Sequence, residues 1–174
     1  MTSLSELVRA RRTTKVFGPE PVDPDTISEL LELARWAPNH HLTNPWRFIV
    51  LGPRSRARLK DAAGRAGSES AAKLDRAPTL IAVGAMQGGA DPVQDEEDLL
   101  AAGCAAFLVL LGAQERGLAS YWRTPAVLRT PQGRAALNVP DDVHLIGLLH
   151  LGPRRQQQPA PERAPVQDVV SWLD

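Results

Sequence analysis

The stretch ARWAPNHHLTNPWRFIV, residues 34–50, carries the most informative pattern in the chain. Pro38 disfavours helical geometry at the residue before it, so the apolar helix that enters this stretch should end there. The run WRFIVLG, residues 46–52, with which the loop ends, is typical of a buried strand. A polar loop lies between the two elements and is bracketed by Trp36 and Trp46. We interpret it as a loop that holds a flat ligand with backbone and amide groups, because two tryptophans are unusual around a plain surface loop.

Upstream of this stretch, the chain predicts two helices joined by a turn. Ser3 and Glu6 form a capping box for the first helix, and Asp23 with Pro24 begins the second. The first helix should end in RARRTTK, residues 9–15. This basic segment has two readings. It is either a solvated helix end, which the helix dipole favours, or a clamp in which arginine forks and threonine hydroxyls hold phosphate and polar ring atoms.

Downstream, three apolar runs predict strands and one long run predicts a helix. The strands are PTLIAVGAM at 78–86, LASYWR at 118–123 and VHLIGLLHLG at 143–152. The helix covers 95–117; its acidic start suits the helix dipole, and its middle is apolar nearly all round. Such a helix should be central, or central and at a subunit interface. Residues 65–72 are the best candidate for a mobile segment, and the apolar tail 166–174 should dock on its own body or on a partner.

The composition narrows the class of protein. The chain has 174 residues, 43% of them hydrophobic, as expected for one globular domain. Twenty basic and twenty acidic residues cancel, so neither nucleic acid nor an anionic membrane is an expected partner. The longest apolar run is shorter than the roughly 20 residues that cross a membrane, and the N-terminus lacks an apolar signal core, so we expect a cytoplasmic protein.

Several common chemistries lack their sequence patterns. The chain has no dinucleotide-binding glycine fingerprint, no phosphate-binding loop with its lysine, and no nucleophile elbow. The single cysteine, Cys104, lies in the apolar helix and is interpreted as a small core residue. His40 and His41 are adjacent and rarely bind one metal together, and His150 in the last strand is interpreted as structural. We therefore expect no metal site and no protein nucleophile.

Two segments together resemble the nitroreductase-like flavoprotein family: RRTTKVFGPEPV, residues 11–22, and the opening stretch. Three more segments are similar to that family in the same order, namely RAPTLIAV at 76–83, the long helix with its following strand at 101–124, and NVPDDVHLIGLLHLGPRR at 138–155. The similarity covers nearly the whole chain. Its short length places the chain near the minimal, single-domain members.

The resemblance implies an α+β fold, a three-layer α/β/α sandwich around a central mixed, mainly antiparallel sheet. It implies one FMN-binding domain over residues 1–174, with 153–174 as a C-terminal arm. It also implies a homodimer that binds FMN at the subunit interface and takes electrons from NAD(P)H. The apolar central helix and the apolar tail agree with a dimer.

The resemblance further implies which residues contact FMN. One subunit supplies the end of the first helix and the end of the strand after the central helix, which are Arg11, Arg12, Thr13, Trp122, Arg123 and Thr124. The other subunit supplies the loop, with Pro38, Asn39, His40, Leu42 and, in place of a more common glutamine, Asn44. Similar spacing adds Lys73 before the second strand, and Arg154 and Arg155 after the last. Arg11 or Lys73 would stabilise the reduced flavin at its N1/O2 edge.

The implied activity is that of an FMN-dependent NAD(P)H oxidoreductase. Hydride passes in a ping-pong cycle from a nicotinamide through FMN N5 to a nitroaromatic, a quinone or a similar small acceptor. No catalytic side chain is expected, because the cofactor carries the hydride. The alternative is a non-catalytic FMN-binding dimer that stores or senses flavin. The sequence leaves open the physiological acceptor and the choice between NADH and NADPH.

Overall fold

The centre of the fold is a four-stranded sheet. The computed structural model describes residues 3–65, 70–89 and 91–173, so part of the predicted mobile segment lies outside the described residues. The strands β1 (Trp46–Val50), β2 (Thr79–Met86), β3 (Leu118–Arg123) and β4 (Val143–Pro153) follow the spatial order β1-β2-β4-β3. All three pairs are antiparallel, and one isolated bridge, between Thr13 and Ser120, is parallel. The mainly antiparallel sheet predicted above is confirmed.

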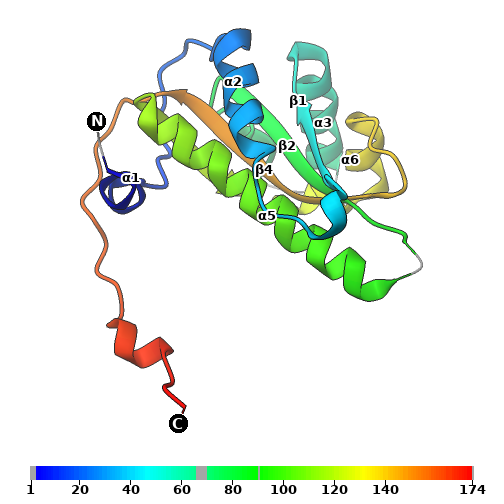
Figure 1. Ribbon diagram of the computed structural model, residues 1–174. Helices are drawn as coiled ribbons and strands as arrows, with labels where there is room; N and C mark the ends of the chain where they lie inside the picture. The colour runs from blue at the N-terminus through cyan, green and yellow to red at the C-terminus, as the bar shows by residue number, and fades with distance from the viewer. Residues whose placement is uncertain (1–2, 66–69, 90, 174) are drawn as a thin grey trace.

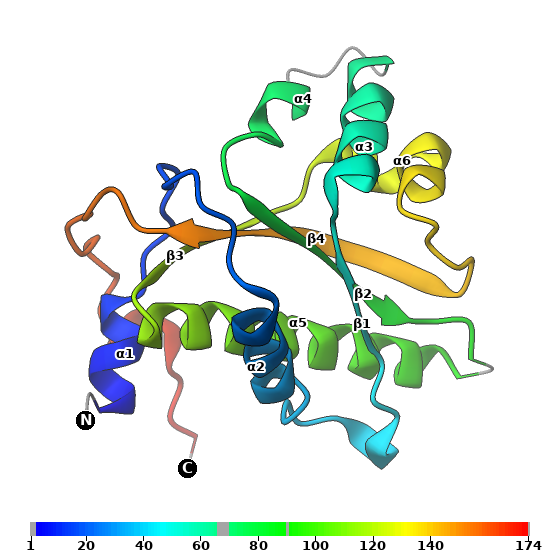
Figure 2. The same ribbon diagram turned by 90° about the horizontal axis from the view of Figure 1, so that it is seen from above.

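Helices cover both faces of the sheet (Figures 1 and 2). One face carries α2 (Pro24–Ala34) and α5 (Pro92–Glu115), and the other carries α3 (Pro53–Arg65), α4 (Ser70–Lys73) and α6 (Pro131–Ala136). The short helix α1 (Leu4–Ala10) lies beside one end of α5, and 3-10 turns form at His40–Leu42, Ala126–Arg129 and Val166–Val169. This is the predicted three-layer α/β/α arrangement.

Successive side chains of β4 point to opposite faces of the sheet and contribute to two hydrophobic cores, one on each face. Leu149 and Leu151 pack with α2 and α5, whereas Leu148 packs with the α3 and α6 layer. The period of two that places successive strand side chains on opposite faces explains this division. The sheet thereby holds one side of α5 against one of its faces.

Local signals act as expected at the helix starts, with small shifts in the bounds. The Ser3–Glu6 capping box is present, and Asp23 caps α2. α2 ends at Ala34, earlier than Pro38 alone requires, and α5 begins at Pro92 because Asp91 caps it. Within the described residues, no helix has the length and apolar character needed to cross a membrane.

One side of α5 faces away from the sheet and stays exposed. Leu100 is 68% exposed and Phe107 40% exposed, and Cys104 lies between them on the same surface. The prediction that Cys104 is a core residue is therefore wrong for the single chain. An all-round apolar helix buries only the side that its own sheet can cover, and the remaining side needs another partner.

The C-terminal arm leaves the body after β4 and runs clear of it (Figure 1). Arg12 holds the arm near α1, through a hydrogen bond of 3.1 Å from its Nε to the carbonyl of Pro159. Beyond that point the apolar side chains of the tail are exposed, with Trp172 at 92%. The tail is thus not docked on its own body.

Candidate functional site

The end of α1 lies against the edge strand β3. Thr13 forms a parallel bridge with Ser120, and the Thr14 amide donates to the Ser120 carbonyl at 3.1 Å. Phe17 pairs with Arg154 just after β4. The basic segment, β3 and the residues after β4 therefore meet at one edge of the sheet, as the sequence-predicted FMN site requires.

Arg11 and Arg12 have different environments although they are neighbours. Arg12 donates to the carbonyls of Arg9, Arg11 and Pro159. The Arg11 side chain is half-buried, and its guanidinium forms no hydrogen bond or ion pair within the part of the chain that the structure describes. Burial lowers the pKa of Arg11, and the positive charges of Arg12 and Arg163 lower it further. A half-buried cation among other cations is a strong candidate to bind an anion.

The two side chains at the end of β3 point to opposite faces of the sheet. Trp122 packs toward α5, near Gly103, and its Nε1 donates to the Ile146 carbonyl at 3.4 Å. Arg123 lies on the other face, where burial lowers its pKa. Its Nη1 is buried and has no hydrogen-bond partner among the described residues.

The remaining predicted cations differ in how they are held. Arg154 donates from Nη2 to Gln114 Oε1 at 2.6 Å and to the Leu118 carbonyl at 3.1 Å. Its Nε is buried and finds no acceptor within residues 3–65, 70–89 and 91–173. Arg155 is exposed and lies 3.8 Å from a carboxylate oxygen of Glu20. Lys73 is the last residue of α4, in the layer opposite α5.

These donors fit FMN. Buried N–H groups are almost always paired in folded proteins, so the orphaned donors of Arg123 and Arg154 call for acceptor atoms. FMN offers phosphate oxygens and ring carbonyls, and the half-buried Arg11 supplies positive charge for the phosphate. Thr13, opposite Ser120 of β3, and Thr124, directly after β3, are both exposed.

The predicted loop residues lie elsewhere on the molecule. Figure 2 shows α1 beside the C-terminal end of α5, and the loop between α2 and β1 nearer its N-terminal end. His40, Leu42 and Asn44 are exposed, and Asn39 is partly so. Pro38 lines an apolar cavity of about 440 Å³ together with Trp122 and the exposed side of α5. The separation of this loop from Arg11 suits a site built from two chains.

The sequence did not reveal what holds this loop. His40 Nδ1 lies 2.7 Å from Glu97 Oε2, and the Thr43 hydroxyl donates to Asp98 Oδ1 at 2.6 Å. Both acids belong to α5. They were interpreted above only as part of an acidic helix start. No periodicity signals a contact between residues more than fifty positions apart.

The sequence also gave no signal for the cationic surroundings of His150. This side chain is fully buried in β4, beside the Tyr121 ring at 5.2 Å, and both ring nitrogens lack partners within the described residues. Burial lowers the pKa of His150 to about 3, and the charges of Arg123, Arg56 and Arg76 contribute. His150 is therefore neutral, as a structural histidine.

We expect His150 to make the protein acid-sensitive. The unfolded imidazole binds a proton below its ordinary pKa of about 6.5, whereas the folded one stays neutral until about pH 3. The stability that depends on neutral His150 is complete above pH 6.5 and falls as the pH drops toward 3. Between pH 7.5 and 5, the free energy of unfolding should fall by about 2 kcal/mol more in the wild type than in His150→Leu. Urea unfolding at both pH values, with FMN saturating, measures this; equal losses would contradict it.

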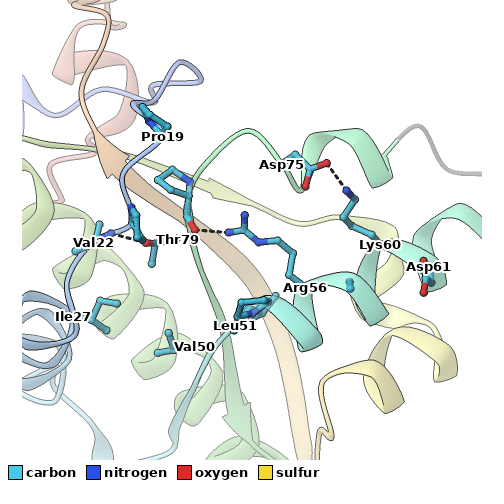
Figure 3. A pocket seen from close by; sticks show the side chains of 15 residues that line it. Pro19, Val22, Ile27, Val50, Leu51, Arg56, Lys60, Asp61, Asp75 and Thr79 are labelled. Carbon is cyan, nitrogen blue, oxygen red and sulfur yellow. Dashed lines mark hydrogen bonds and ion pairs between the residues drawn. The ribbon is translucent and has the colours of Figure 1, made fainter.

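A larger pocket, of about 740 Å³, lies at the C-terminal end of β1, where Val50 and Leu51 line it (Figure 3). Its lining is mostly apolar, and several of its polar groups are already paired. Arg56 donates to the carbonyls of Ala77 and Pro78, and Lys60 pairs with Asp75 at 2.5 Å. None of the predicted FMN residues lines it. The β3 edge, with its orphaned donors, is the better candidate for a phosphate-bearing cofactor.

The sequence and the fold are both similar to those of known proteins. The model of the nitroreductase family matches residues 8–153. The Bacillus subtilis (strain 168) protein named "Putative NAD(P)H nitroreductase YfhC" is 25% identical, over 95% of this chain and 91% of its own. A nitroreductase-like family protein from Bacillus cereus has a TM-score of 0.89 at 24% identity, covering 100% of this chain and 97% of its own. The FMN and NADPH-dependent nitroreductase NfnB from Sphigopyxis sp. strain HMH has a TM-score of 0.82 at 19% identity, with 99% of each chain covered.

Proposed function

Because the chain belongs to the nitroreductase family, we propose that this oxidoreductase uses FMN and NAD(P)H to reduce nitroaromatics, quinones or similar small acceptors. The observation that carries the proposal is the half-buried guanidinium of Arg11, which has no partner among the described residues; two more unpaired donors, Arg123 Nη1 and Arg154 Nε, lie near the two ends of β3. The names of the relatives support the choice of FMN and NAD(P)H. The cytoplasmic location and the single domain with its arm stay predictions.

The residues of this edge would divide the work of holding the cofactor. Arg11 and Thr13 would bind the phosphate and the polar edge of the ring, and Trp122 to Thr124 would lie along the ring. FMN, when bound, supplies the redox chemistry, accepting electrons from the nicotinamide and passing them to the acceptor in a ping-pong cycle. Arg11 would also stabilise negative charge at the ring's N1/O2 edge. All of these contacts with FMN stay predictions, as do those of Arg12, Lys73, Arg154 and Arg155.

The same proposal includes a homodimer with two composite sites. The exposed side of α5, with Leu100, Cys104 and Phe107, is the apolar surface that a second copy would cover. In that dimer the loop at residues 38–44 would pack over the partner's flavin. The exposed tail, with Val169 at 78% and Trp172 at 92%, would dock on the partner, because its own body does not bind it.

The test is spectral and kinetic. The purified protein should show the visible absorbance of bound flavin, and heating should release a flavin that chromatographs as FMN. NADH or NADPH should then be oxidised in the presence of a quinone or a nitroaromatic, with parallel double-reciprocal lines as ping-pong kinetics require. Bound FMN without turnover against any acceptor would favour a flavin store or sensor. A protein that binds no flavin would refute both.

A further inference from the structure

The loop at residues 38–44 has a backbone that needs outside support. His41, Leu42 and Asn44 have φ angles of 52°, 52° and 48°, in the left-handed region that residues with side chains rarely adopt. A backbone held in this region is strained and persists only where surrounding contacts fix it. Three such residues in one short loop call for an anchor.

Thr43 provides the stronger of two anchors. Its hydroxyl donates to Asp98 Oδ1 at 2.6 Å, and the same oxygen accepts from Gln94 Nε2 at 3.1 Å. Asp98 is only 7% exposed and belongs to α5, the rod that crosses the sheet. Short hydrogen bonds from a hydroxyl to a carboxylate are among the strong ones, especially away from water. The loop is therefore tied to α5, the long helix that packs across the sheet.

His40 provides a second, weaker anchor. Its Nδ1 lies 2.7 Å from Glu97 Oε2, but the two side chains are 56% and 40% exposed, so water screens the pair. Within the loop, the Asn44 amide donates to Asn39 Oδ1 at 3.0 Å and keeps the turn closed. The bond between Asn44 and Asn39 thus closes the turn, and the bond from Thr43 to Asp98 fixes the loop against α5.

We propose that Asp98, acting through Thr43, is a positioning residue of the flavin site. It holds the loop at residues 38–44 in the form that packs over the partner's flavin. This inference rests on the proposed function. Thr43 is itself exposed, so the core does not depend on its hydroxyl. Losing the bond should therefore disturb the site and leave global stability nearly intact.

The test compares Thr43→Val, which removes the hydroxyl at constant shape, with Thr43→Ser, which keeps it. A hydrogen bond to a charged group contributes strongly to holding the loop in position. Without this bond, kcat/KM for the acceptor should fall about tenfold or more in Thr43→Val. Thr43→Ser should keep most of the wild-type kcat/KM. Thr26→Val is the matched control, because Thr26 donates to Asp23 Oδ2 at the same 2.6 Å but lies at the start of α2. It should leave kcat/KM unchanged.

A second measurement separates the anchor from the proposed function. Amide hydrogen exchange across residues 39–44 should speed up in Thr43→Val while α5 stays protected and the urea midpoint is unchanged. Faster exchange and lower kcat/KM, both reversed by serine, support the inference. Unchanged exchange and unchanged kcat/KM overturn it, as does a loss of activity that follows a loss of global stability. A wild type that binds no flavin or has no turnover would instead refute the proposed function, and faster exchange in Thr43→Val would still show the anchor.

A double variant adds a check on the pair itself. Asp98→Asn keeps an acceptor oxygen but removes its charge, so its loss of kcat/KM should be smaller than that of Thr43→Val. If the two residues act through one bond, Thr43→Val with Asp98→Asn should be little worse than Thr43→Val alone. Losses that multiply fully would mean that Asp98 acts on the site by another route, and would overturn the assignment.

Discussion

Arg11→Ala should raise the dissociation constant of FMN roughly ten- to a hundredfold. The guanidinium is half-buried, has no acidic partner among the described residues and is surrounded by positive charge. A bound phosphate would give the half-buried guanidinium an anionic partner and would offset the positive charge around it. A charge-assisted hydrogen bond contributes about 1.5–3 kcal/mol, which converts to that range of affinity. Flavin fluorescence quenching on titration of the flavin-free protein measures it.

Two further variants sharpen the result for Arg11. Arg11→Lys keeps the charge but not the planar fork, and should lose less affinity than alanine. Arg54→Ala removes one exposed positive charge from α3 and should leave FMN affinity unchanged. An Arg11→Ala protein that binds FMN as tightly as the wild type would remove this guanidinium from the site, however well the rest of the family resemblance holds.

The contrast between Arg11 and Arg12 shows where sequence reasoning stops. The segment RRT predicts a clamp but cannot rank two adjacent arginines. In the structure the helix has already ended: Arg11 is its C-cap, with extended backbone angles of −61° and 131°. Neighbouring side chains on extended backbone point in opposite directions. Arg12 therefore donates to the carbonyls of α1 and the arm. Arg12→Ala should release the arm more than it weakens FMN binding.

The strands, in contrast, could be predicted almost to the residue. LASYWR was expected at 118–123 and forms β3 there, and the last strand differs from its predicted bounds by one residue. Such runs are short, apolar and bounded by turns, so local pattern suffices. The exposure of Cys104 could not be predicted in this way. On a helix that is apolar all round, periodicity does not say which side meets the chain's own sheet and which side needs a partner.

The composite site leads to a test by mixed dimers. The proposal places Arg11 in one subunit and the loop in the other, around the same flavin. Leu42 is 77% exposed, and the bonds that hold the loop to α5 come from His40 and Thr43. Leu42→Trp should therefore block the flavin face without releasing the loop from α5. Arg11→Ala should weaken FMN binding in its own chain. At limiting FMN, each variant homodimer should be nearly inactive, because both of its sites carry a defect.

A mixed dimer of Arg11→Ala with Leu42→Trp should behave differently. Both defects fall in one site, and the other site receives a wild-type Arg11 and a wild-type loop. If the chains assort randomly on co-expression, about half of the dimers are mixed, so roughly a quarter of the wild-type sites should return. Mixing the purified homodimers should restore activity only slowly, because a large apolar interface exchanges slowly. If verified mixed dimers show no more activity than the sum of their parents, the two segments do not share a flavin. The loop, with its anchor on Asp98, would then cover its own chain.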